Sequence, residues 1–184
     1  MRKLNEQKVQ KVENEQKVQR GHQTLREFIA LLCKIGCAAL VCWVMYHFFF
    51  GIGVVSGEAM YPRMRDGDLV VYFRINSEYN IGDIVTFKVD GKRQYARITA
   101  RGGDTVDMTE DGQLTVNGNV QQEEVFSATS KEGRKTVFPC QVERDAVFVL
   151  CDNRGNAQDS RDYGPVRIAD IDGKVISLLR RRGL

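Results

Sequence analysis

An apolar stretch over residues 28–55 constrains the fold of this chain more than any other feature, because it is long enough to cross a membrane. Only Lys34 and His47 interrupt it. Residues 35–55 alone number 21, and a helix that rises about 1.5 Å per residue crosses roughly 30 Å of hydrocarbon at that length. Aromatic residues gather toward the far end, as they do at a membrane interface: Trp43, Tyr46, Phe48, Phe49 and Phe50. The sequence therefore predicts a transmembrane anchor over residues 28–55.

The anchor separates a polar tail, residues 1–27, from a larger domain, residues 56–184. The first 34 residues carry eight basic and four acidic side chains, whereas the remaining 150 carry 19 and 20. Basic flanks stay on the cytoplasmic side, so we expect a single-pass protein of the cell membrane with a cytoplasmic N-terminus and an extracytoplasmic domain. A cleavable signal peptide has a shorter apolar core and does not follow a polar tail of this length, which favours an uncleaved anchor.

The basic tail predicts contact with a lipid bilayer rather than with nucleic acid. A platform for single-stranded nucleic acid interleaves aromatic with basic residues, and the tail has no aromatic residue before Phe28. The sequence contains neither a CxxC pair nor a cluster of His and Cys, so we expect no metal and no cofactor. Three of the five cysteines lie in the apolar stretch, and Cys140 and Cys151 could pair only if the fold brings them together.

The residues after the anchor predict strands rather than helices. Segments rich in Val, Ile, Tyr and Phe alternate with tight turns that contain Gly with Asp or Asn. We expect strands at 69–75, 84–89, 94–100, 106–108, 114–116, 146–151 and 175–179. Residues 119–144 are weakly patterned and suggest an extended excursion. The spacing indicates a mostly β, antiparallel domain, built as a barrel or as paired sheets.

Three segments of the domain carry recognisable motifs. The first, residues 56–68, follows the anchor directly and contains SGEAMYP and DGD. The second contains Tyr95-Ala96-Arg97 followed by Gly103-Asp104. The third joins CDNR at 151–154 to DSR at 159–161. Each motif alone is modest evidence, so their order and spacing carry the argument.

In this order, behind an N-terminal anchor, the segments resemble the bacterial type I signal peptidases over about residues 28–182. The resemblance implies a β fold seated on the outer membrane surface that cuts signal peptides after small residues in an Ala-x-Ala pattern. That family uses a Ser nucleophile and a Lys general base. A Ser hydroxyl is a weak nucleophile until a neighbouring base accepts its proton. A Lys serves as that base only if burial lowers its pKa enough to keep it neutral.

The chain departs from the family at the positions that would carry this chemistry. The family's nucleophile falls at Ala59 and its general base falls at Ala96. A Ser that orients the Lys in many members falls at Ala157. A methyl group neither attacks a carbonyl nor accepts a proton, so we predict that the ordinary dyad is absent.

The frame around the vacated positions is retained. Ser56 matches the family's oxyanion-hole side chain, with a plain turn hydroxyl as the alternative, and Met60 and Pro62 match residues that shape the nucleophile turn. The charged residues expected to form structural ion pairs are Arg97 with Asp152, and Asp159 with Arg161. The other structural motif positions are Gly67, Asp68, Gly103, Asp104, Asn153 and Ser160.

Cys151 is the alternative nucleophile, because it is the thiol within the third motif segment. Its position matches a small residue of the family, usually Gly, that leaves room beside the base. A reactive thiolate needs a lowered pKa and a partner base, and the sequence shows neither, so we assign Cys151 no catalytic role. Glu58, beside the vacated nucleophile position, is better explained by surface solvation.

Two origins fit an emptied dyad in a retained frame: an engineered inactive mutant and a natural relative. A signal-peptidase-like subgroup associated with pilus assembly in Gram-positive bacteria also lacks the Ser and Lys, and residues 60–63, 66–69 and 180–184 resemble that subgroup. We therefore favour a non-catalytic binder or assembly helper that holds exported precursors, such as pilins, as extended peptides. The alternatives are a signal peptidase I serine endopeptidase with its dyad removed and a purely structural anchored domain.

Overall fold

The computed structural model describes residues 2–75, 78–121, 129, 134–155 and 157–180, with side chains from residue 26 onward. The chain forms two compact units, Met1–His47 and Phe48–Leu184. The first unit is helical and the second contains the strands.

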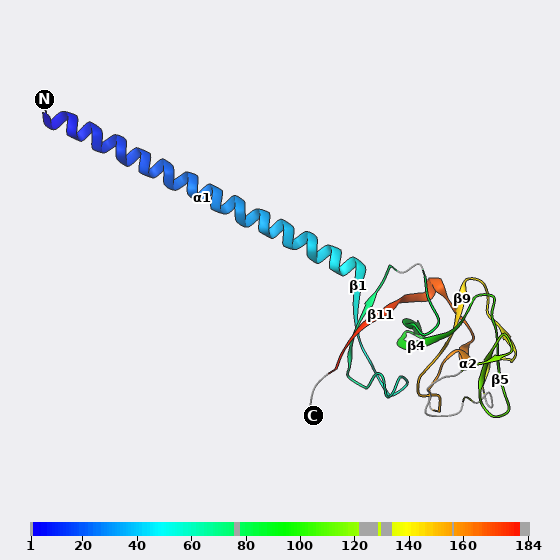
Figure 1. Cartoon of the computed structure of the whole chain (residues 1–184). Coiled ribbons are helices and arrows are strands. Elements are labelled where there is room, and N and C mark those ends of the chain that lie inside the picture. Colours follow the sequence, from blue (N-terminus) through cyan, green and yellow to red (C-terminus); the bar gives the residue numbers. More distant parts are fainter. Residues whose placement is uncertain (1, 76–77, 122–128, 130–133, 156, 181–184) are drawn as a thin grey trace. The chain divides into compact units, whose positions relative to one another are not determined.

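Helix α1 runs from Arg2 to Phe49, so the backbone of the polar tail is helical as well (Figure 1). Its part from Arg26 to Phe49, 24 residues, is long enough and apolar enough to cross a membrane. The helix ends before residue 55, where we expected the anchor to end, because the next five residues form strand β1 (Phe50–Val54). Gly51 and Gly53 alternate there with large apolar residues, and glycine weakens a helix while this period of two suits a strand.

The larger sheet has seven antiparallel strands, in the spatial order β1, β2 (Leu69–Phe73), β11 (Ile171–Leu179), β3 (Ile84–Val89), β4 (Lys92–Arg101), β9 (Ala146–Leu150) and β10 (Val166–Arg167). The smaller sheet has the order β7 (Asn119–Val120), β6 (Leu114–Val116), β5 (Thr105–Met108) and β8 (Cys140–Gln141). Two short helices, α2 (Ser160–Tyr163) and a 3-10 turn (Ile168–Asp170), lie in the C-terminal part. Within the described residues β1 and β10 are the edges of the larger sheet and do not pair with each other. The predicted antiparallel β class is therefore confirmed as two open sheets rather than a closed barrel.

Strand β9 separates two hydrophobic clusters, because all five of its side chains are buried. Successive side chains of a strand point to opposite faces. Val147 and Val149 belong to the cluster that also contains the alanine positions of the motif. Ala146, Phe148 and Leu150 belong to the cluster under the smaller sheet. The sequence of this strand, AVFVL, does not alternate between apolar and polar residues. Both faces of the strand are buried, so every position is apolar.

Glycines allow β1 to approach the strands that it covers. A Cβ atom at Gly51 would lie 2.2 Å from the ring of Tyr72, and one at Gly53 would lie 2.2 Å from the hydroxyl of Tyr95. The Tyr95 hydroxyl donates a long hydrogen bond of 3.5 Å to the carbonyl of Val54. The glycines thus let two tyrosine rings fill the space beneath β1.

All five cysteines are free. Cys151 is buried in the first cluster, whereas Cys140 packs against the second. The two domain cysteines therefore do not pair in this structure, because the strand between the clusters separates them.

Candidate functional site

The first motif segment is a closed loop that connects β1 to β2. The N–H of Val55 donates to the carbonyl of Asp68, and the N–H of Gly67 donates back to the carbonyl of Val55, both at 2.9 Å. Within the loop, the N–H of Gly57 donates to the Asp66 carboxylate at 2.7 Å. Gly67 has a φ of 82°, a conformation that glycine adopts without a steric penalty. These contacts explain the Asp-Gly-Asp sequence at the end of the loop.

Asn153 attaches this loop to the third motif segment. Its backbone N–H donates to the carbonyl of Ala59 at 3.0 Å. Its side-chain amide donates to the carbonyl of Glu58 at 3.1 Å. The peptide units on both sides of the vacated nucleophile position are thus held by one residue of another segment. The side chain of Ser56 is exposed in the same loop.

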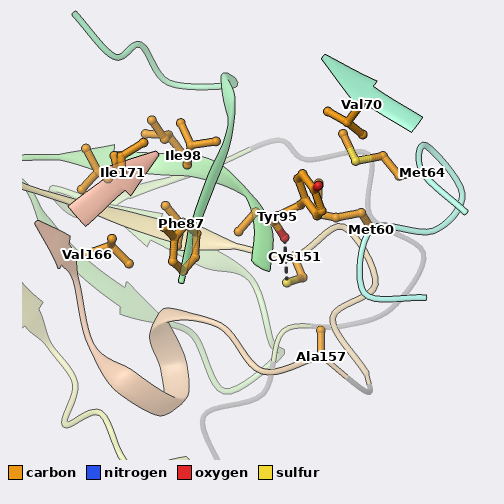
Figure 2. Packing of buried hydrophobic residues seen from close by; sticks show 14 of the residues in the cluster. Met60, Met64, Val70, Phe87, Tyr95, Ile98, Cys151, Ala157, Val166 and Ile171 are labelled. Atoms are coloured by element: carbon orange, nitrogen blue, oxygen red, sulfur yellow. Dashed lines mark hydrogen bonds between the residues drawn. The ribbon is translucent and has the colours of Figure 1, made fainter. Parts of the chain in front are cut away.

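The three alanine positions meet at one hydrophobic cluster. Ala96, on β4, is 0% exposed and Ala157 is 3% exposed. Ala59 is half-buried and packs against the same cluster, which also contains Met60 and Cys151 (Figure 2). Pro62, the remaining predicted residue of the turn, is half-buried and follows a cis peptide bond. The structure brings the three predicted positions to one cluster, and their methyl groups supply no nucleophile and no base.

An ion pair connects the second and third motif segments. The Arg97 guanidinium donates to both carboxylate oxygens of Asp152, at 2.8 and 2.7 Å. The same guanidinium donates to the carbonyl of Gly82 at 2.7 Å. A bidentate pair fixes relative orientation as well as distance. It therefore holds β4 beside the segment that carries Asn153.

A second ion pair lies in the interior. Arg161 and Asp159 have side chains with 0% exposure, and two N–O distances of 2.8 and 2.9 Å join them. Arg161 also donates to the carbonyl of Arg154 at 2.8 Å. Asp159 accepts a hydrogen bond from the N–H of Cys151 at 3.2 Å and caps helix α2. Ser160 lies between Asp159 and Arg161 in the sequence, and its buried hydroxyl accepts a hydrogen bond from the N–H of Val149 at 3.0 Å.

Two arginines contribute to the site without having been predicted. Arg154 is 2% exposed and donates to the carbonyl of Cys151 at 2.7 Å and to the Thr129 hydroxyl at 2.8 Å. Arg134 donates to the carbonyl of Ala157 at 3.1 Å and to the Asp162 carboxylate at 2.8 Å. Arg154 is the last residue of the CDNR motif, but the sequence indicated no separate role for it. Arg134 lies in the weakly patterned stretch and had no sequence signal.

Gly103 and Asp104 lie away from the alanine cluster, in the turn between β4 and β5. The N–H of Gly103 donates to the carbonyl of Val142 at 2.9 Å. The Asp104 carboxylate accepts from the N–H of Arg101 and from the Asn117 amide, both at 2.8 Å. This motif therefore connects the two sheets rather than lining the site. Among the described residues no group of three or more His, Cys, Asp or Glu side chains could hold a metal ion.

Cys151 has the wrong electrostatic environment for a nucleophile. Its burial raises the pKa of the thiol far above the ordinary range, and the neighbouring Asp159 carboxylate acts in the same direction. The thiolate is the nucleophilic form of cysteine. At neutral pH the thiol therefore stays protonated, which agrees with the absence of a catalytic role expected from the sequence.

Cys151 is expected to resist alkylation in the folded protein. Folded protein treated with iodoacetamide at pH 8 should show an unmodified Cys151 peptide by mass spectrometry, because the thiol is both buried and protonated. The same treatment in denaturant should modify it fully. Rapid modification in the folded state would show an accessible thiolate, and Cys151 would again be a candidate nucleophile.

Fold and site together define a membrane-anchored β protein that fixes a tight loop against a buried hydrophobic cluster. The sequence profile described as "Signal peptidase, peptidase S26" matches residues 25–179. The chain belongs to this signal peptidase family.

Individual relatives agree with this assignment. Signal peptidase I S of Bacillus subtilis (strain 168) is 32% identical over 136 residues, which cover 68% of this chain and 73% of the relative. A signal peptidase I of Bacillus amyloliquefaciens is also 32% identical, over 166 residues and 83% of each chain. A solved signal peptidase I from Enterococcus faecalis V583 is 26% identical, with a TM-score of 0.47, covering 55% of this chain and 98% of that one.

Proposed function

We propose that this protein binds exported precursor proteins, such as pilins, as extended peptides and does not cleave them. The observation that carries the proposal is a retained loop and scaffold around Ala59 and Ala96. Asn153, Arg97 and Asp152 keep contacts that would position a nucleophile and a base, although neither group is present. A frame of this kind can still present backbone donors and apolar pockets to a peptide.

Strand addition is the proposed mode of binding. An extended peptide adds to an exposed sheet edge through main-chain hydrogen bonds, while pockets select alternate side chains. β1 forms one edge of the larger sheet and leads directly into the loop that contains Ala59. A peptide that pairs with this edge would run toward the loop that contains Ala59, the half-buried member of the three alanine positions. Signal-peptide-bearing precursors, the substrates that the family implies, are therefore the proposed class of ligand.

A combined cleavage and retention assay tests this function. The full-length protein in detergent is mixed with a precursor that carries an Ala-x-Ala site, with an active signal peptidase at equal concentration as the positive control. We expect no cleavage, together with retention of the precursor on the immobilised protein. Specific cleavage would show that the nucleophile has been misplaced, and absence of retention would contradict the binding proposal.

A pair of asparagine variants makes the retention assay specific. Asn153→Ala removes the amide that holds the carbonyl of Glu58, so it should weaken retention of the precursor. Asn119→Ala changes an exposed asparagine on the smaller sheet and should leave retention unchanged. Equal retention by the two variants would show that the loop is not the binding site.

We further propose that the N-terminal tail is cytoplasmic and that the β domain lies outside and contacts the bilayer. The charge of the tail supports this orientation. The sheet register aligns Val54 with Leu69 and Leu69 with Leu179, and these three side chains are 57%, 43% and 58% exposed. Directly opposed residues share a face, so the three form an exposed apolar row, of which Val54 follows the anchor helix by five residues.

Protease protection measures the orientation. A membrane-impermeant protease added to intact protoplasts should degrade an epitope at the C-terminus and leave an N-terminal epitope intact. Inverted membrane vesicles should give the opposite pattern. Degradation of the N-terminal epitope in intact protoplasts would contradict the proposed topology.

A further inference from the structure

The thiol of Cys151 occupies the interior between two of the emptied positions. Its Sγ lies 3.7 Å from the carbonyl oxygen of Tyr95 and 3.7 Å from that of Gln158 (Figure 2 marks the first of these contacts). Tyr95 precedes Ala96 on β4, and Gln158 follows Ala157. The thiol therefore contacts both the strand that carries the base position and the loop that carries the base-orienting position.

Cys151 and Ala96 lie next to the last pair of the ladder between β4 and β9. That ladder ends where Arg97 pairs with Leu150. Ala96 precedes Arg97 and Cys151 follows Leu150, so the two residues are adjacent to the same end of the ladder. Both residues are fully buried, at 0% and 1% exposure, in the same cluster.

The backbone of Cys151 is held on both sides. Its N–H donates to Asp159 at 3.2 Å, and its carbonyl accepts from Arg154 at 2.7 Å. Asp159 is itself fixed by the buried ion pair with Arg161. These contacts fix the Cys151 backbone beside the cluster that contains its thiol.

We propose that Cys151 closes the space that a lysine at position 96 would need, so that the site has been repacked around Ala96 rather than merely emptied. This inference rests on the proposed non-catalytic function. A lysine would add three methylene groups and an amine to the Ala96 methyl group, in an interior that is close-packed. Its amine would need acceptors, and the carbonyls of Tyr95 and Gln158 already contact the thiol.

A double-mutant cycle tests this coupling. Ala96→Lys and Ala96→Met are each made in the full-length protein with and without Cys151→Gly, and the thermal unfolding midpoint is measured by calorimetry in detergent. We expect both substitutions to lower the midpoint, and Cys151→Gly to remove at least half of each loss. The methionine variant adds length without charge, so it keeps the test valid if Ala96→Lys does not fold. Cys140→Gly, in the other cluster, is the control and should relieve neither loss.

The proposal also predicts when a variant with restored catalytic residues would cleave a precursor. A variant with Ala59→Ser, Ala96→Lys and Ala157→Ser should not cleave an Ala-x-Ala precursor until Cys151→Gly is added. An equal midpoint loss for Ala96→Met with and without Cys151→Gly would overturn the proposal, as would cleavage by the variant that retains Cys151. Retention of precursors is measured on the protein without substitutions. If it fails, the proposed binding function is contradicted, but the stability result for Ala96 and Cys151 is unaffected.

Discussion

Asp159→Ala is expected to lower the free energy of unfolding by roughly 3–5 kcal/mol, the cost typical of removing one partner from a buried ion pair. The Arg161 guanidinium would lose its carboxylate while remaining fully buried, since both side chains have 0% exposure. The N–H of Cys151 and the start of helix α2 would lose an acceptor as well. Asp159→Asn, which keeps the shape without the charge, should have an intermediate effect. Thermal or chemical unfolding of the full-length protein measures both.

An exposed pair in the same domain gives the matched control. Asp170 accepts from Arg167 at 2.9 Å, but the two side chains are 49% and 63% exposed. Water can replace that contact, so Asp170→Ala should leave the unfolding midpoint nearly unchanged. Similar effects of Asp159→Ala and Asp170→Ala would show that the interior pair does not stabilise the fold.

Gly173→Ala is expected to be the second severe substitution, with a loss of roughly 2–4 kcal/mol. A Cβ atom at this position would lie 2.4 Å from the backbone carbonyl oxygen of Phe73 and 2.8 Å from the ring of Tyr72. Backbone atoms of β2 cannot move away without disrupting the ladder with β11. The strands would separate locally, which unfolding measurements on the full chain would detect.

Gly36→Ala adds the same methyl group where nothing lies within 4 Å. Gly36 is part of helix α1, in which alanine is the better residue. We therefore expect no loss of stability of the β domain. A loss comparable to that of Gly173→Ala would show that the contact at Gly173 is not the cause.

Strands that have turn residues at both ends could be predicted from the sequence. β3 and β6 begin and end at the predicted residues, because Gly-Asp, Asp-Gly and Asn-Gly turns flank them. Asn117 and Gly118 have φ values of 52° and 78°, the conformation that favours this pair in tight hairpins. β11 begins at Ile171, four residues before the predicted start, because Asp172 and Gly173 read as a turn although they belong to a strand.

Features set by tertiary contacts could not be predicted. β1 was included in the predicted anchor, since its apolar residues continue the hydrophobic stretch, and the alternation with Gly51 and Gly53 does not show that it pairs with β2. The motif indicated that Ala59, Ala96 and Ala157 belong to one site. It did not indicate that Cys151 contacts both the strand that carries Ala96 and the loop that carries Ala157, or that Arg134 and Arg154 hold the surrounding loops. The contacts of Cys151 with β4 and of Arg134 with the loop at Ala157 join segments far apart in sequence, where local patterns carry no information.

The position of β11 determines when the domain can finish folding. The last strand of the chain lies between β2 and β3, so β1 and β2 share no ladder with β3, β4, β9 and β10 until it arrives. A chain made from its N-terminus therefore exposes two unpaired strand edges until residues 171–179 emerge. Non-local pairing of this kind is slow to form. During synthesis, we expect the strands on the two sides of β11 to remain unpaired with each other. The domain becomes a single cooperative unit only when β11 is inserted between them.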